Sequence, residues 1–345
     1  MLVQTLTSQQ FITVVPGQPP LTIQQALALA MHHQSERRLG EAERICRQVL
    51  QVDSAQPVAL HMLGVLAHFA GQSEIAINLI NAALSSVPDY FGAHNNLGNV
   101  FKDIGKLDEA AASYRAAIAI KPDYAEAHAK LGVVLHNMGQ MEAAAASYRN
   151  AISLDPKVAD THNNFGNLLM DMGNLDAAVT SYRKAVAANP NFAELHGNLG
   201  NALKRQGKLD EAIASYRQAL AIKSDLPDVH NNLGTVLQKQ GRLEEAVLLY
   251  RSAIAIRADF ADAYSNLGNA LWGLGRLEDA ATSYRSALAI NPQFFEATGS
   301  LGSVLLALGR MEEGLAMEAT GFGAIQFDLE QGVSIHQGSK QESKK

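Results

Sequence analysis

Small and apolar residues recur along this chain with a period of 34 residues. Leucine, or Phe165 in one copy, precedes a recurrent glycine in every copy. In seven of the eight copies an alanine follows that glycine twelve residues later, and in six copies a tyrosine follows the alanine by four more. The recurrent glycines are Gly64, Gly98, Gly132, Gly166, Gly200, Gly234, Gly268 and Gly302. Repetition at this period predicts one supersecondary element copied in tandem rather than the separate globular domains that length alone would suggest.

Each repeat is predicted to hold two helices. Residues 125–139 show helical apolar periodicity, and so do residues 141–154 before Pro156. A second recurrent glycine suits a left-handed cap after the first helix. It occurs as Gly105, Gly139, Gly173, Gly207, Gly241, Gly275 and Gly309. We expect the first glycine and the alanine to lie where two helices cross. There a Cβ on the glycine would collide with the backbone of the partner helix, and the tyrosine would fill the volume beside them.

The residues Leu97, Gly98, Ala110, Tyr114 and Pro122, with their equivalents, resemble the pattern of the tetratricopeptide repeat. The resemblance implies an all-α, right-handed superhelical solenoid whose first helices line the concave face. We count about nine repeats, of which the first and last are degenerate. Their boundaries are predicted at 23–56, 57–90, 91–124, 125–158, 159–192, 193–226, 227–260, 261–294 and 295–328. We expect residues 1–22 to be a flexible leader, with a short pairing strand at FITVV as the alternative, and 329–345 to form a tail.

Composition narrows the class of protein further. The chain has 345 residues, a formal net charge of −6 and a single cysteine, Cys46. The hydrophobic content of 47% excludes general disorder. The single cysteine excludes an internal disulfide, and the negative net charge leaves no basic surface for nucleic acid. No apolar run is long enough to span a membrane, and the N-terminus makes a poor signal peptide. We therefore expect a cytoplasmic protein that binds neither nucleic acid nor membrane; the sequence leaves its oligomeric state open.

Two columns of side-chain amides follow the first helices. The first amide column lies two residues before the recurrent glycine and holds Asn96, Lys130, Asn164, Asn198, Asn232, Asn266 and Ser300. The second amide column lies one residue after it and holds Asn99, Val133, Asn167, Asn201, Thr235, Asn269 and Ser303. Residues three apart share a helix face, and an amide can pair with both the N–H and the C=O of a peptide backbone. Alternatively, these amides are a solvated polar face that was copied by duplication.

These columns resemble the asparagine ladder of O-linked N-acetylglucosamine transferase-type proteins, which holds extended substrate polypeptides. The resemblance implies a grip on an extended peptide. Because no catalytic motif accompanies it, the first hypothesis is a non-catalytic scaffold that binds the peptide through Asn96, Asn99, Lys130, Asn164, Asn167, Asn198, Asn201, Asn232, Asn266 and Asn269. The alternative is a substrate-recruiting portion or subunit of such a glycosyltransferase system that lacks the catalytic domain. On the first hypothesis, replacing several of the asparagines with alanine should weaken peptide binding with little change in melting.

Acidic residues precede the first amide column by four positions, for example Glu126 and Asp160. They disfavour the capture of a C-terminal carboxylate and favour an extended or basic segment, although acids in a first helical turn also suit the helix dipole. His94, His128, His162, His196 and His230 also recur. One repeat separates each from the next, which is too far for shared metal coordination, so we expect them to pack between helices.

No catalytic motif stands out. The chain lacks a zinc-protease helix motif, a phosphate loop and a nucleophile elbow, and we expect neither an enzyme nor a cofactor. Gly321-Phe322-Gly323 is predicted to be a turn that ends the last helix. Ile325, Phe327, Val333 and Ile335 alternate like strand residues around a turn, and residues 337–345 are expected to be disordered.

Overall fold

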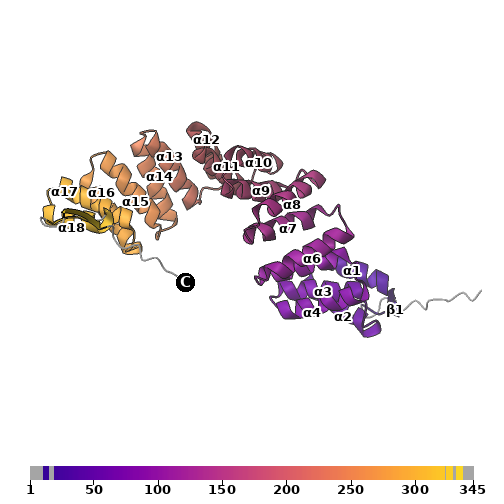
Figure 1. Ribbon diagram of the computed structural model, residues 1–345. Coiled ribbons are helices and arrows are strands. Elements are labelled where there is room, and N and C mark those ends of the chain that lie inside the picture. Colours follow the sequence, from indigo (N-terminus) through magenta and orange to yellow (C-terminus); the bar gives the residue numbers. More distant parts are fainter. Residues whose placement is uncertain (1–10, 15–18, 323, 329–331, 337–345) are drawn as a thin grey trace, which may run out of the picture. The chain divides into compact units, whose positions relative to one another are not determined.

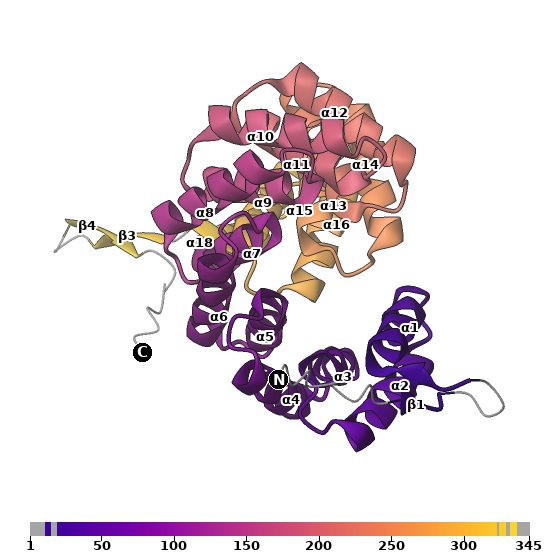
Figure 2. The same ribbon diagram turned by 90° about the vertical axis from the view of Figure 1, so that its right-hand side faces the viewer.

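The computed structural model describes residues 11–14, 19–322, 324–328 and 332–336. The described residues form helices that follow one another in antiparallel pairs (Figures 1 and 2). The first helices of the pairs are α1 (Ile23–Ser35), α3 (Pro57–Phe69), α5 (Phe91–Asp103), α7 (Ala125–Asn137), α9 (Ala159–Asp171), α11 (Ala193–Arg205), α13 (Pro227–Lys239), α15 (Ala261–Gly273) and α17 (Phe295–Ala307). The second helices are α2 (Leu39–Val52), α4 (Ser73–Ser86), α6 (Leu107–Ile120), α8 (Met141–Leu154), α10 (Leu175–Ala188), α12 (Leu209–Ile222), α14 (Leu243–Ile256), α16 (Leu277–Ile290) and α18 (Met311–Phe322). The predicted all-α repeat fold is confirmed.

The chain divides into two compact units, residues 1–168 and 169–345, and α9 spans the division. In the first unit, each second helix from α2 to α6 packs against both its own partner and the first helix of the next repeat. In the second unit, the same succession of contacts runs from α10 to α18. Each pair thus buries its apolar face on its neighbours, and stability is approximately a sum of repeats and nearest-neighbour interfaces.

The crossing of the two helices in a pair is built from glycine, alanine and tyrosine. Ala110 and Tyr114 are buried, and so are the equivalent alanines and tyrosines of the other repeats that carry the tyrosine. A Cβ on Gly98 would lie 2.6 Å from Cε1 of Tyr114. The expectation that this Cβ would meet the partner's backbone is therefore wrong in these repeats, because the tyrosine ring lies between the helices. At Gly302, by contrast, an added Cβ would lie 2.6 Å from the backbone nitrogen of Glu318.

The turn between the two helices of a pair needs a left-handed residue. Gly105 has φ +77°, its N–H donates to Lys102 O, and the next N–H, from Lys106, donates to Phe101 O. These bonds form a Schellman motif. The other predicted cap glycines, and Gly71 as well, also have positive φ. In the first repeat, Arg37 takes the equivalent position with φ 59°.

We expect Arg37→Gly to raise the free energy of unfolding by about 1 kcal/mol, because a residue with a Cβ is strained in the left-handed region and glycine is not. Thermal melting followed by circular dichroism measures the change. The matched control is Gly105→Ala, which places a Cβ on the same conformation and should lower stability by about 1 kcal/mol. An Arg37→Gly chain that melts no higher than the wild type would contradict the prediction.

The N-terminal segment corrects one expectation. β1 (Phe11–Ile12) pairs antiparallel with β2 (Leu21–Thr22), and Ile12 and Val14 are buried against α1 and α2. Arg44 of α2 donates from Nη1 to the carbonyl of Val14 at 2.6 Å. A flexible leader therefore does not describe residues 11–14 and 19–22, and the strand alternative is the correct one. Two buried apolar side chains and one hydrogen bond to a backbone carbonyl thus hold residues 11–14 against the first helix pair.

At the other end, the predicted strand alternation is confirmed. β3 (Ala324–Asp328) pairs antiparallel with β4 (Gly332–His336), so that Ile325 lies opposite Ile335 and Phe327 opposite Val333. Since α18 ends at Phe322, the last helix pair ends before the boundary expected at residue 328. The expected disorder at residues 337–345 lies outside the described residues.

The recurring histidines have a structural role. His94 Nε2 lies 2.9 Å from the carbonyl oxygen of Pro88, six residues earlier. The same 2.9 Å contact recurs at His128, His162, His196 and His230. Because a carbonyl only accepts, Nε2 must carry the proton. Each histidine thus ties the loop between two repeats to the next first helix, which agrees with the packing role expected for them.

Candidate functional site

The two amide columns lie on the first helices, and their described members are half-buried. A half-buried amide has one side against protein and the other toward solvent, so it can serve packing and binding together. Hydrogen bonds within the protein decide how much of each amide is left for a ligand.

Several members of the second amide column accept hydrogen bonds from the hydroxyls of the buried tyrosines. The hydroxyl of Tyr114 donates to Asn99 Oδ1 at 2.8 Å. Tyr216 donates to Asn201 at 2.7 Å and Tyr284 to Asn269 at 2.6 Å. The sequence analysis missed this role, although the tyrosine follows the asparagine by fifteen residues in each case. Removing these asparagines would leave a buried hydroxyl without its acceptor, so their loss would lower stability as well as any binding.

In the first unit, the amides continue into a directed chain of hydrogen bonds. Asn99 Nδ2 donates to Asn96 Oδ1 at 3.2 Å, and Asn96 Nδ2 lies 2.8 Å from His61 Nε2. An amide nitrogen only donates, so His61 Nε2 accepts and its proton lies on Nδ1, 2.9 Å from the Tyr90 hydroxyl. Burial lowers the pKa of His61 to about 4, which keeps the ring neutral as this chain requires. Sequence reasoning missed His61 because it stands one position away from the recurring histidines.

In the second unit, neighbouring first helices share amides. Asn232 Nδ2 donates to Asn201 Oδ1 at 3.1 Å, and Lys204 donates to Asn232 Oδ1 at 2.8 Å. Asn266 donates to Asn231 at 3.0 Å. Asn198 of this unit, and Asn167 of the first, also have partners within the protein. The columns are therefore partly used to join successive repeats.

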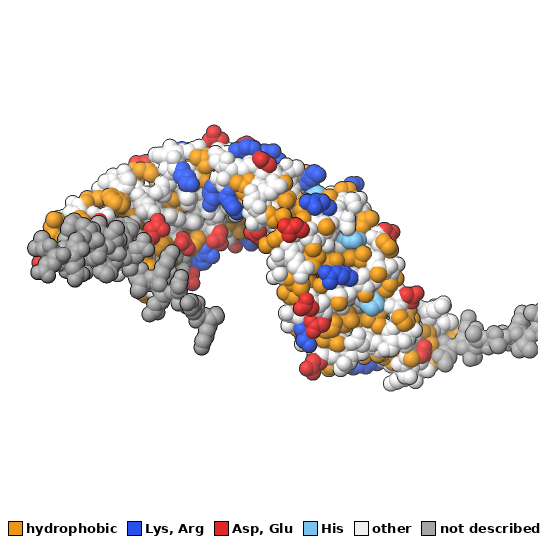
Figure 3. Space-filling view, viewed as in Figure 1, with side chains coloured by type: hydrophobic (Ala, Val, Ile, Leu, Met, Phe, Trp, Pro, Cys, Tyr) orange, Lys and Arg blue, Asp and Glu red, His pale blue; other side chains and the backbone are white. Residues whose placement is uncertain are grey.

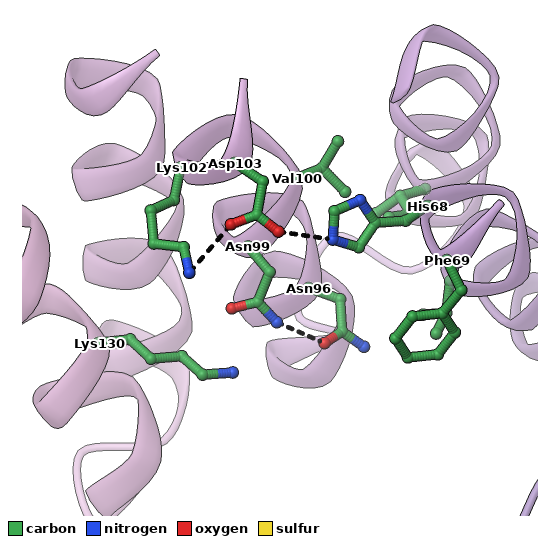
Figure 4. Close-up of a pocket in the computed structure, with 10 residues that line it drawn as sticks. His68, Phe69, Asn96, Asn99, Val100, Lys102, Asp103 and Lys130 are labelled. Carbon is green, nitrogen blue, oxygen red and sulfur yellow. Dashed lines mark hydrogen bonds and ion pairs between the residues drawn. The ribbon is translucent and has the colours of Figure 1, made fainter. Parts of the chain in front are cut away.

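One hollow of about 300 Å³ opens on α3, α5 and α7 in the first unit and brings together Asn96, Asn99 and Lys130 (Figure 4). Lys102 and Lys130 both extend toward Asn99 in the close-up. The rest of the lining is Val65, His68, Phe69, Ile80, Val100 and Asp103. His68 Nε2 and Lys102 Nζ lie 3.1 and 3.0 Å from the two oxygens of Asp103. Phe69 leaves 66% of its surface exposed, which is unusual for phenylalanine.

A second hollow of about 350 Å³ opens on α7, α8 and α9 and includes Lys130 and Asn164. Five of its lining residues are apolar, and three carry carboxylates. The lining residues are Ala125, Glu126, Ala129, Lys130, Val133, Ala151, Asp155, Val158, Asp160, Thr161 and Asn164. The two hollows share Lys130, so they are adjacent along the first helices. Four of the predicted site residues, Asn96, Asn99, Lys130 and Asn164, thus line one continuous stretch of surface.

Within the described residues, three of the six acidic positions beside the columns are ion-paired. Lys130 pairs with Glu126, and in the second unit Arg257 pairs with Asp228 at 2.8 Å and Lys223 with Glu194 at 3.7 Å. Burial alone would raise the pKa of Glu126, but hydrogen bonds led by that of Lys130 lower it. Asp160 has no ion-pair partner among the described residues. Basic and acidic side chains are interspersed on the face shown in Figure 3.

Other kinds of site were sought in the part of the chain that the structure describes. It holds no group of three or more histidine, cysteine or acidic side chains that could bind a metal ion. None of the described helices is long and apolar enough to cross a bilayer. Burial raises the pKa of the Cys46 thiol to about 11, so this cysteine is a core residue rather than a reactive one.

Comparison with known families agrees with the helix pairs and their small-residue crossings. The family model described as TPR repeat matches residues 98–139, 138–173, 166–207, 200–241 and 239–275, and the model described as tetratricopeptide repeat matches residues 261–294. The chain belongs to the tetratricopeptide repeat family. No protein with a curated description matches it significantly.

Solved structures of other tetratricopeptide repeat proteins are similar to this one. PilF of Pseudomonas aeruginosa is 22% identical, with a TM-score of 0.52 over 59% of this chain and 92% of its own. The Cut9–Hcn1 hetero-tetramer of the APC/C matches at 17% identity and a TM-score of 0.54, over 77% of this chain and 52% of that one. YrrB, described as a TPR protein with an unusual peptide-binding site, matches at 22% identity and a TM-score of 0.48, over 53% and 95%. At these identities the likeness to PilF and to Cut9–Hcn1 shows the fold alone.

Proposed function

We propose that this tetratricopeptide repeat chain is a non-catalytic interaction scaffold that binds an extended peptide along its first helices. The observation that carries the proposal is the pair of adjacent hollows that share Lys130 and are lined by Asn96, Asn99 and Asn164. Amides and ammonium groups beside apolar pockets are suited to hold a peptide backbone and its side chains at once. A stretch of surface that runs along α3, α5, α7 and α9, in four successive repeats, also fits an extended ligand better than a compact one.

Hydrogen bonds within the protein indicate which amides are available to a ligand. Asn99, Asn201 and Asn269 accept from buried tyrosines, and Asn96 is held by His61. Asn164 lines a hollow and belongs to the first column, whereas the tyrosine hydrogen bonds described above end on the second column. The peptide grip is therefore proposed to rest more on the first amide column than on the second.

We expect the triple variant Asn164→Ala, Asn198→Ala, Asn266→Ala to weaken binding of an extended peptide by about tenfold or more. Each backbone hydrogen bond contributes roughly 0.5–1.5 kcal/mol, and three of them are changed. The probe is a pool of fluorescein-labelled peptides with randomised central residues, measured by fluorescence anisotropy on the full chain. Unchanged binding would contradict the proposal.

Asn81→Ala combined with Asn150→Ala is the matched control, because both asparagines are exposed on second helices. This control should bind the peptides as the wild type does. Equal melting temperatures for the two variants would separate lost binding from lost folding.

The narrower alternative, a substrate-recruiting portion of an O-GlcNAc transferase-like system, uses the same surface and stays a prediction. It predicts that a sugar-nucleotide-dependent enzyme co-purifies with the chain. Nucleotide-sugar hydrolysis by the purified chain alone would instead contradict the non-catalytic proposal.

A further inference from the structure

The hollow on α7, α8 and α9 stands where the preceding repeat has a filled aromatic cluster. In that repeat, Phe91 and Tyr124 pack edge to face with ring centroids 5.2 Å apart, and Lys121 Nζ lies 4.9 Å from the Phe91 centroid. The Tyr124 hydroxyl donates to Glu126 at 3.1 Å. Two rings, one cation and one carboxylate thus close the surface there.

Thirty-four residues later, each member of that cluster is replaced. Ala125, Asp155, Val158 and Asp160 stand at the positions equivalent to Phe91, Lys121, Tyr124 and Glu126, and all four line the hollow. Both rings are lost, the cation becomes an anion, and only the carboxylate is kept. Ala125 matches Ala159, Ala193 and Ala261 of other repeats, so the departure lies at Val158, where most repeats carry an aromatic residue (Tyr90, Tyr124, Phe192, Phe260 and Phe294). The hollow is therefore a repeat surface that lacks the aromatic cluster.

The amide columns change at the same place. Lys130 stands in the first column where most other repeats have asparagine, and Val133 stands in the second. Both line the hollow, and Asn164 of the next repeat borders it. These departures converge on one surface, whereas random drift in a repeat would scatter them over the helices. The charged groups that face the hollow are the Glu126–Lys130 pair and the carboxylates of Asp155 and Asp160.

We propose that this hollow is a side-chain subsite for an aromatic residue, with a basic residue beside it, in the bound peptide. The aromatic ring would occupy the space that Phe91 and Tyr124 fill one repeat earlier, and a ligand tyrosine could donate to Asp160 as Tyr124 does to Glu126. The ligand's cation would lie beside Asp155, where the preceding repeat supplies its own lysine. The volume of about 350 Å³ is at the lower end for ligand pockets, which suits one large side chain. This inference rests on the proposed peptide-binding function and names the ligand chemistry that the site selects.

The test uses the full chain and a short labelled glycine–serine peptide with a central Tyr-Lys pair, measured by fluorescence anisotropy. Peptides with Ala-Ala, Leu-Lys or Tyr-Glu at the centre are compared with it. Burial of an aromatic side chain should make Tyr-Lys bind about tenfold or more tightly than Ala-Ala. Leu-Lys binding as tightly as Tyr-Lys would overturn the choice of an aromatic residue.

Two variants locate the effect. Val158→Tyr restores the ring found one repeat earlier and should abolish the preference for Tyr-Lys over Ala-Ala without lowering the melting temperature. Asp155→Lys keeps the hollow but restores the cation, so it should abolish only the preference for Tyr-Lys over Tyr-Glu.

If all peptides bind the wild type equally and the triple asparagine variant weakens them, the subsite is overturned while the proposed function stands. If none of the peptides binds, the proposed function fails together with the subsite. A Tyr-Lys preference that survives Val158→Tyr would also overturn the inference, since the aromatic residue would then be bound elsewhere.

Discussion

Tyr216→Cys is expected to lower the free energy of unfolding by about 3–5 kcal/mol, the range for emptying a buried aromatic site. Tyr216 is completely buried, and its hydroxyl donates to Asn201 at 2.7 Å. The substitution removes the ring from the crossing of α11 and α12 and leaves the amide oxygen without its donor. Urea denaturation followed by circular dichroism measures the loss.

Tyr216 also determines how much stability is lost when Gly200 is replaced by a larger residue. A Cβ on Gly200 would lie 2.6 Å from Cε1 of Tyr216, so Gly200→Ala alone should cost about 1–3 kcal/mol by overpacking. With Tyr216→Cys in place, the added methyl should fill vacated space. The double variant is therefore expected to be more stable than the sum of the single effects predicts.

The first repeat supports this expectation, because it carries the small pair already. Ala30 and Cys46 stand there at the positions of the recurrent glycine and tyrosine, and both are completely buried. Gly268→Ala combined with Tyr216→Cys is the matched control, since these residues belong to different repeats and their effects should add. Additive effects for Gly200 and Tyr216 would show that the ring does not decide the need for glycine.

The 34-residue period was sufficient to predict the helix pairs, the cap glycines and the small-residue crossings. These features depend on local conformation and on spacing along one or two helices, which the sequence shows directly. The cap glycines share a left-handed backbone conformation at the end of the first helix. Arg37 has the same conformation without being glycine, and the repeat pattern alone did not reveal it. The N-terminal strand was predicted only as an alternative to a flexible leader, because its partner strand, Leu21–Thr22, has only two residues.

The candidate site could be predicted only in part. The amide columns follow from spacing, but the bond from Tyr114 to Asn99 depends on how two helices face each other. For this reason alanine at Asn99, Asn201 or Asn269 is expected to lower the melting temperature, contrary to the expectation from the sequence that melting would be nearly unchanged. The hollow at Val158 was also not predicted, because it arises from residues that the repeat lacks rather than from a motif that it contains.

Acid is expected to destabilise the first unit through His61. Burial lowers the pKa of this imidazole from its ordinary value of 6.5 to about 4. A group with a depressed pKa in the folded state binds protons preferentially when unfolded. Its contribution to stability is therefore complete above about pH 6.5 and is lost as the pH falls toward about 4. Linkage gives a loss of about 2 kcal/mol at a pH of about 5.

The hydrogen bonds of the His61 ring explain why it resists protonation. His61 Nε2 accepts from the Asn96 amide, and Nδ1 lies 2.9 Å from the Tyr90 hydroxyl. Protonation would place two N–H groups on the ring, so the Asn96 amide would face a donor in place of an acceptor. Because Asn96 is also bonded to Asn99, the disturbance would pass directly into the amides of the hollow.

His61→Gln should remove this part of the acid sensitivity, because glutamine cannot titrate. The measurement is the difference in unfolding free energy between about pH 7.5 and about pH 5, compared between wild type and variant, with an expected gap of about 2 kcal/mol. Asn81→Ala is the control, because it changes an exposed side chain that does not titrate and leaves His61 and its partners in place. This variant should keep the wild-type pH dependence. If His61→Gln retained the full acid sensitivity, the sensitivity would belong to the carboxylates of the first unit and His61 would have no part in it.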